Sequence, residues 1–172
     1  MFRTLAALLA SGCLLAACSP TYNWREVRAV PGGLIAMLPC KPDKGARTVP
    51  MAGREVTLDA LSCDTGGATF ALLAADIVDV ARAGEVLAQW KTATLANLRS
   101  SSARENAFRP PGARDLPQSL QVVASGQRGN GSQVESHAAY FARGSHVFQA
   151  VIYADQLQPE AAEPFFSGLK FE

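Results

Sequence analysis

The 172-residue sequence is poor in the side chains on which many enzyme sites are built. It contains only two histidines and four cysteines. The Gly-x-Ser-x-Gly elbow of many hydrolases and the Gly-Lys-Ser/Thr ending of a phosphate-binding loop are both missing. The pattern therefore predicts no catalytic residue and no cofactor.

Long apolar runs are missing as well, because the stretch Leu5–Ala17 is too short to cross a bilayer, which takes about 20 apolar residues. Arg3 precedes this stretch, and Ala16 and Ala17 end it with small side chains. This arrangement is typical of a secretory signal peptide, which we place at residues 1–17. We therefore expect the mature chain to leave the cytoplasm.

The run Leu15-Ala16-Ala17-Cys18 resembles the lipobox of bacterial lipoproteins. The resemblance implies that Cys18 is acylated, that it becomes the first residue of the mature protein, and that residues 18–23 form a short tether. Ser19 follows in place of the aspartate of inner-membrane retention signals. By this analogy the protein is anchored by lipid in the outer membrane and faces the periplasm. An incidental Cys18 in a secreted protein, or cleavage before Cys13, is the alternative.

An excess of charge of one sign is also lacking. The chain has 16 Lys and Arg against 15 Asp and Glu. Removal of residues 1–17 takes Arg3 away, which leaves the mature chain formally neutral. A neutral domain has no basic surface for phosphates, so the composition argues against nucleic acid as a partner.

Two cysteines remain once Cys18 carries lipid, namely Cys40 and Cys63. The periplasm is oxidising, and we predict that these two form a disulfide with Cα atoms within about 7 Å of each other. Two free buried thiols are the alternative. A zinc site is disfavoured because no further cysteine or histidine lies nearby, and no metal is predicted.

The first half of the chain has the short apolar runs and turns of an antiparallel sheet. Pro31–Gly33 is a predicted turn and Pro42–Gly45 a predicted loop. Alternating or continuous apolar residues predict strands. The predicted strands are 24–30, 33–38, 47–49, 54–63 and 69–75.

One amphipathic helix is predicted at 81–98, with Asp79 as its N-cap. Its apolar stripe should pack on the sheet, with Trp90 in the core. The stripe consists of Val80, Ala83, Leu87, Trp90, Thr94 and Leu98.

Residues 100–118 are predicted to connect this helix to the next strand as a loop rich in serine, proline and arginine. Arg104, Arg109 and Arg114 make the segment locally basic. It is either an ordinary solvated loop or a surface that binds an envelope protein, because long loops are often functional.

The last third predicts three strands and a helix. Strands are expected at 119–127, 132–142 and 146–154, with Asn130-Gly131 in a hairpin turn. This register places His137 opposite Ile152 and His146 opposite Arg143, too far apart for a shared site. Pro159 can open a short helix over Glu160–Ser167 that ends at Gly168.

Leu38-Pro39, the central helix, the run Ala142–Val151 and the ending Phe165–Leu169 together resemble the PsbP-like family. The resemblance implies that residues 24–172 form one α+β domain. In that fold an antiparallel sheet of about six to seven strands is flanked by a long central helix and a short C-terminal helix. It also implies non-enzymatic docking onto a larger protein assembly.

We therefore expect a non-enzymatic accessory lipoprotein that binds the membrane through its lipid and an unidentified envelope protein through its domain. The alternative is a binder of a small apolar ligand or lipid in a pocket between sheet and helix. A third hypothesis is a hydrolase that brings His137 or His146 beside a serine and a carboxylate.

Overall fold

The computed structural model describes residues 20–51, 53–100 and 102–172. The predicted signal peptide, Cys13 and Cys18 lie outside the described residues. The prediction of a lipid anchor is therefore carried by the sequence alone.

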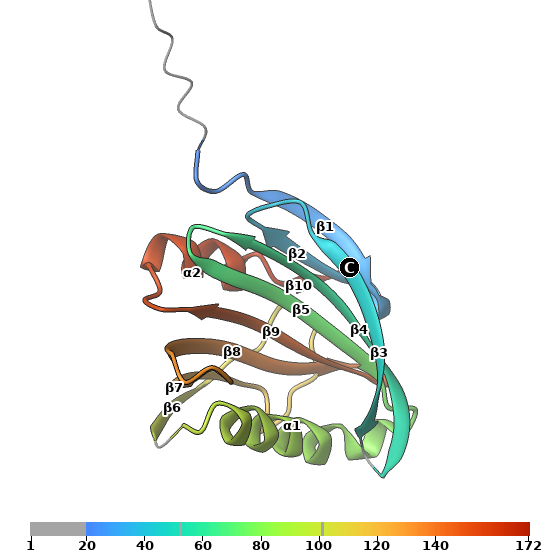
Figure 1. The fold of residues 1–172 in the computed structure, drawn as a ribbon. Coiled ribbons are helices and arrows are strands. Elements are labelled where there is room, and N and C mark those ends of the chain that lie inside the picture. The colour runs from blue at the N-terminus through green and yellow to red at the C-terminus, as the bar shows by residue number, and fades with distance from the viewer. Residues whose placement is uncertain (1–19, 52, 101) are drawn as a thin grey trace, which may run out of the picture.

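Seven antiparallel strands form the main sheet, in the order β3-β4-β5-β9-β8-β7-β6. The sheet curves over α1 (Figure 1). Its strands are β3 Asp43–Met51, β4 Arg54–Thr65, β5 Ala68–Asp76, β6 Ser102–Ala107, β7 Leu120–Gln127, β8 Gln133–Arg143 and β9 His146–Ala154. The predicted antiparallel sheet of about six to seven strands is therefore confirmed.

A second, three-stranded sheet was not predicted as a separate unit. It has the order β1-β2-β10 and is built from β1 Arg25–Val30, β2 Leu34–Leu38 and β10 Lys170–Phe171. A 3-10 turn, η1 Pro31–Gly33, joins β1 to β2. The two ends of the domain thus meet in one small sheet.

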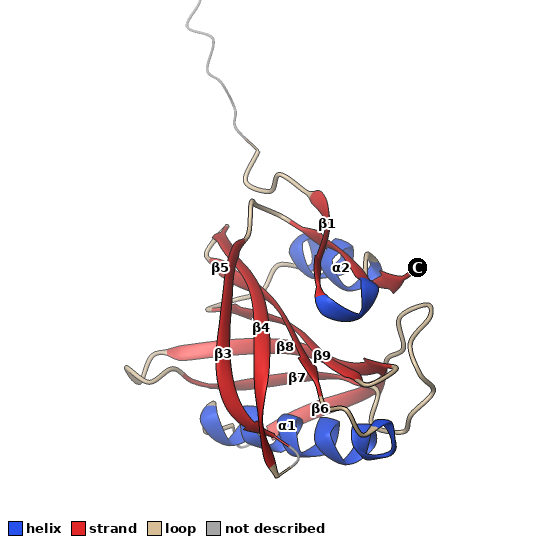
Figure 2. Ribbon diagram, turned by 90° about the vertical axis from the view of Figure 1, so that its right-hand side faces the viewer, coloured by secondary structure: helices blue, strands red, loops and turns tan. Residues whose placement is uncertain are grey.

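Two α-helices cover opposite faces of the main sheet (Figure 2). Helix α1 spans Ala83–Asn97 and α2 spans Pro159–Ser167. The expectation of a central long helix needs correction, because α1 lies on one face and is not at the centre of the layers. The other face is covered by α2 together with the small sheet.

Alternation along β8 and β9 divides the interior into two cores. Phe141 and Phe148 stack with ring centroids 5.4 Å apart on the α2 side. Tyr140 and Val147 point to the α1 side. Both faces of these strands are covered, so residues 138–142 of β8 and 147–152 of β9 are buried without interruption.

Two segments predicted as loops are strands. Pro42–Gly45 overlaps β3, which pairs with β4 from Asp43 onward. The 100–118 loop contains β6, which pairs with β7. Both are edge strands with mostly exposed polar side chains, so the apolar alternation that signals a strand is missing from their sequences.

The predicted helix at 81–98 is present, but it begins with a separate 3-10 turn, η2 Val80–Arg82. The Asp79 carboxylate caps this turn by accepting a hydrogen bond of 3.0 Å from the Ala81 amide. Val80 therefore precedes the α-helix and is 42% exposed, which corrects its place on the buried stripe.

The predicted disulfide between Cys40 and Cys63 is confirmed, with Cα atoms 6.0 Å apart. Cys40 follows β2 and Cys63 lies in β4. The covalent bond therefore joins the small sheet to the main sheet.

The chain is fixed to the domain from Thr21 onward. The Thr65 hydroxyl donates a hydrogen bond of 2.7 Å to the Thr21 carbonyl, and the Asn23 amide donates to the Pro39 carbonyl at 2.8 Å. The Trp24 ring packs edge-on against Phe70. This attachment lies at the end of the domain away from α1 (Figures 1 and 2).

Candidate functional site

A pocket of about 550 Å³ opens between α1 and the curved main sheet. Small-molecule sites commonly have volumes of about 300–1,000 Å³ and mainly apolar walls. Strands β3, β4 and β5 form one wall, and α1 faces them. The main apolar side chains of the lining are Val49, Met51, Leu58, Leu73, Val86 and Trp90.

Trp90 contributes to this wall rather than to a sealed core. Its side chain is half-buried and meets the Tyr140 ring edge-on, with centroids 6.4 Å apart. The Trp90 side chain is therefore less buried than the sequence predicts. Neither histidine is among the residues that line this pocket.

A buried polar cluster lies beside the apolar wall. Gln149, from the middle of β9, is 4% exposed, and its Nε2 donates to the Tyr140 hydroxyl at 2.9 Å and to Thr94 Oγ1 at 3.1 Å. The Thr94 hydroxyl in turn donates to the Trp90 carbonyl at 3.0 Å. These bonds hold α1 to the sheet and orient the polar groups without ionised side chains.

Burial raises the pKa of the two tyrosines of this region, Tyr140 and Tyr153. Loss of hydration raises the pKa of Tyr140 to about 12, although its hydrogen bonds with Thr94 and Gln149 oppose the rise. Burial likewise raises the pKa of Tyr153, which lines the pocket and hydrogen bonds with Ser136. At neutral pH both phenols are hydrogen-bonding groups rather than general bases.

The charged side chains among the lining residues are two arginines, Arg47 and Arg128, and no aspartate or glutamate lines the pocket within the described residues. Arg47 lies on β3 opposite Leu58 of β4, so both side chains are on the pocket face of the sheet. No hydrogen bond or ion pair joins Arg47 to another described residue, and its side chain is exposed.

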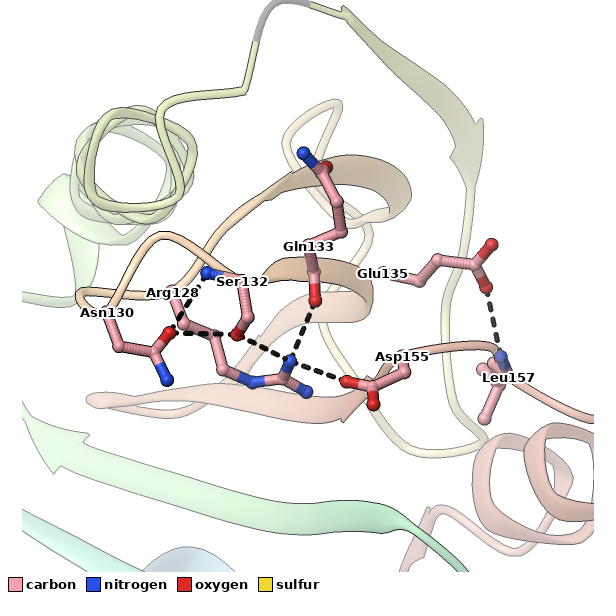
Figure 3. A network of polar contacts seen from close by, with 7 residues as sticks. All are labelled: Arg128, Asn130, Ser132, Gln133, Glu135, Asp155 and Leu157. Atoms are coloured by element: carbon pink, nitrogen blue, oxygen red, sulfur yellow. Dashed lines mark hydrogen bonds and ion pairs between the residues drawn. The ribbon is translucent and has the colours of Figure 1, made fainter.

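Arg128 is held differently, by the network drawn in Figure 3. Its Nη1 lies 2.6 Å from Asp155 Oδ1 and donates to the Gln133 carbonyl at 2.7 Å. A longer bond of 3.3 Å reaches Ser132, whose hydroxyl donates to Asn130. The Arg128 charge is therefore largely compensated at the pocket edge, whereas the Arg47 charge is not.

The three arginines predicted for partner binding lie on different parts of the structure. Arg104 is exposed on the edge strand β6, and Arg109 pairs with Asp115 at 3.1 Å. Arg114 donates to the Val80 carbonyl at 2.7 Å, which ties the loop to η2. Among the described residues no hydrogen bond or ion pair joins any two of these arginines. Arg104 is the one that remains exposed without a pairing.

The predicted positions of the two histidines are confirmed, with His137 opposite Ile152 and His146 opposite Arg143. His137 borders a second, shallower groove of about 530 Å³ on the α2 face, together with Glu163 and Ser167. Burial lowers the His137 pKa. Catalysis by a serine nucleophile needs a hydrogen-bonded base, and none of the hydrogen bonds of the described residues joins these three side chains.

The described residues contain no group of three or more histidine, cysteine, aspartate or glutamate side chains placed to hold a metal ion. Within the same part of the chain, no helix has the length and apolar character to span a membrane.

The sequence predicted a ligand pocket between sheet and helix only as an alternative, and it placed three of the lining residues, Trp90, Thr94 and Leu98, on the core-facing stripe of the helix without assigning them to a site. One available signal was Gln149, a polar residue in the apolar run Val147–Val151. Comparison with known protein-family models and with curated proteins found no match to this chain.

Proposed function

We propose that this chain is an outer-membrane lipoprotein that faces the periplasm and binds a small, largely apolar ligand without chemical turnover. The observation that carries the proposal is the pocket between α1 and the main sheet. Its walls include apolar side chains of α1 and of the sheet, and the buried polar groups beside them, Gln149, Tyr140 and Thr94, are neutral and hydrogen-bonded to one another. Such a site can bind and orient a ligand, but it offers no activated nucleophile.

The proposed location rests on the lipobox resemblance at Cys18. The Cys40–Cys63 disulfide agrees with an oxidising compartment. The few residues between Cys18 and the fixed Thr21 span at most about 10 Å, so the anchor would hold the domain close to the membrane. The pocket would then lie at the end of the domain away from the bilayer.

Ligand binding is tested by filling the pocket from α1. Ala93 lines the pocket and is exposed, so Ala93→Trp adds a large ring there without replacing a core residue. Ala96→Trp is the matched control, because Ala96 is exposed on the same helix and does not line the pocket. The full chain carrying Cys18→Ser can be titrated without detergent with the neutral fluorophore N-phenylnaphthylamine.

We expect the fluorophore to bind the parent and Ala96→Trp with similar affinity and to bind Ala93→Trp at least about tenfold more weakly, which corresponds to 1.4 kcal/mol. Absence of binding to the parent, or equal binding to all three chains, would contradict the proposed function.

The anchor is tested separately by mass spectrometry of the mature N-terminus. The expected product begins at Cys18 and carries acyl chains and diacylglycerol. Cys18→Ser should abolish the modification, whereas Cys13→Ser should leave it intact. A mature chain that begins elsewhere, or that carries no lipid, would refute the proposed location.

A further inference from the structure

We infer that the ligand is an anionic single-chain amphiphile, namely a fatty acid whose carboxylate is bound by Arg47 and whose chain lies along α1. This inference rests on the proposed function, because it names the chemistry of a ligand for the same pocket. It depends on the distribution of charge and apolar surface around the pocket rather than on the volume alone.

The charged side chains that line the pocket are all positive. Its lining includes Arg47 and Arg128, and no carboxylate among the described residues faces them from the lining itself. Asp155, from outside the lining, compensates Arg128. The remaining uncompensated charge is the single guanidinium of Arg47.

A guanidinium presents donors in a planar fork that matches a carboxylate, and one such group neutralises one negative charge. Arg47 is exposed and hydrated in the free protein, so a carboxylate adds an ion pair that a neutral ligand cannot form. A fatty-acid carboxylate pairs with Arg47 while the head group stays at the exposed side of the pocket.

The apolar part of the ligand has partly exposed apolar side chains of the lining to cover. Leu58 lies directly across the β3–β4 pair from Arg47. Leu73 and Trp90 are partly exposed and extend the apolar lining from the sheet to α1, whereas Leu58 and Val86 are buried within that lining. A flexible hydrocarbon chain that begins at the Arg47 head-group site therefore enters apolar surroundings at once.

The test compares dodecanoate with dodecanol, which has the same chain length and no charge at neutral pH. Both are measured by displacement of N-phenylnaphthylamine from the full chain carrying Cys18→Ser. Arg47→Gln removes the charge at the pocket. Arg104→Gln is the matched control, because Arg104 is an exposed strand arginine that does not line the pocket.

We expect dodecanoate to bind more tightly than dodecanol, and Arg47→Gln to weaken dodecanoate about fivefold, the size of effect that a partly exposed ion pair gives. Dodecanol binding and the behaviour of Arg104→Gln should be unchanged. If both amphiphiles bind equally, or if Arg47→Gln has no effect on dodecanoate, the inference fails while the proposed function stands. If neither amphiphile nor the fluorophore binds the parent, both fail.

Discussion

Gln149 illustrates how one residue links the stability of the domain to its pocket. It lies on the central strand β9, contacts α1 through Thr94, and hydrogen bonds with Tyr140 of the neighbouring strand. A buried amide without partners is destabilising by about 1–3 kcal/mol, so this arrangement is favourable only while both partners are present. The Gln149 side chain also lines the pocket. It thus has both a structural and a ligand-facing position.

Tyr140 gives a pH-dependent prediction at the same scale. Its pKa is about 12 in the folded protein, against 10.0 as the ordinary value. The unfolded chain therefore loses the phenolic proton first, and the stability due to neutral Tyr140 is present below pH 10 and is lost as the pH rises toward 12. The loss is at most about 1.4 kcal/mol per pH unit for one group.

The measurement is the free energy of unfolding in urea at a series of alkaline pH values. The parent should lose stability more steeply above pH 10 than Tyr140→Phe, which has no phenol to ionise there. Identical slopes for the two chains would show that Tyr140 ionises normally in the folded state.

At the scale of the elements, the position of α1 determines the width of the pocket. The C-terminal end of α1 is fixed to β7, because the Gln127 amide donates to the Leu98 carbonyl at 2.7 Å. Gly126 permits this approach. A Cβ atom at that position would lie 2.2 Å from the Leu98 carbonyl oxygen, which belongs to the backbone and cannot rotate away.

We predict that Gly126→Ala lowers the free energy of unfolding by about 1–3 kcal/mol, the usual cost of overpacking. It should also weaken N-phenylnaphthylamine binding, because the end of α1 must move. Gly45→Ala is the control, since a Cβ there meets nothing within 4 Å and Gly45 does not line the pocket. Denaturant titration checks the stability, and equal stability of the two variants would contradict the close packing of α1 on β7.

Elements with strong local patterns could be predicted from the sequence, and those set by distant partners could not. The β8–β9 pair has apolar alternation and a tight turn, and its register is as predicted. Strand β6 was not predicted because its residues are polar and exposed. Its extended conformation depends on pairing with β7 rather than on a local sequence pattern. The pairing of β10 with β2 joins the two ends of the domain, and no local pattern contains that information.

At the scale of the whole molecule, the pocket results from the curvature of the main sheet. The edge strand β3 bends over α1, so side chains far apart in the sequence, such as Arg47 and Trp90, line one space. Each of them has an ordinary local environment, which is why sequence patterns led to the helix and the strands but not to the site.

The disulfide and the fixed N-terminal segment act at the same scale. Cys40–Cys63 joins the small sheet to the main sheet, and Thr21 is held at the end of the domain that lies away from α1. With the proposed anchor at Cys18, the bilayer and the pocket would lie at opposite ends of one domain. Ligand exchange would then occur on the periplasmic side.

The most direct test of the central claim is photo-crosslinking of the full chain with a diazirine derivative of dodecanoate, followed by mapping of the labelled peptides by mass spectrometry. The account predicts label on α1, at Ala83–Asn97, and on β3, at Asp43–Met51, with the label strongly reduced in Ala93→Trp. Label confined to α2 and the groove beside His137, or label that is unchanged in Ala93→Trp, would contradict it.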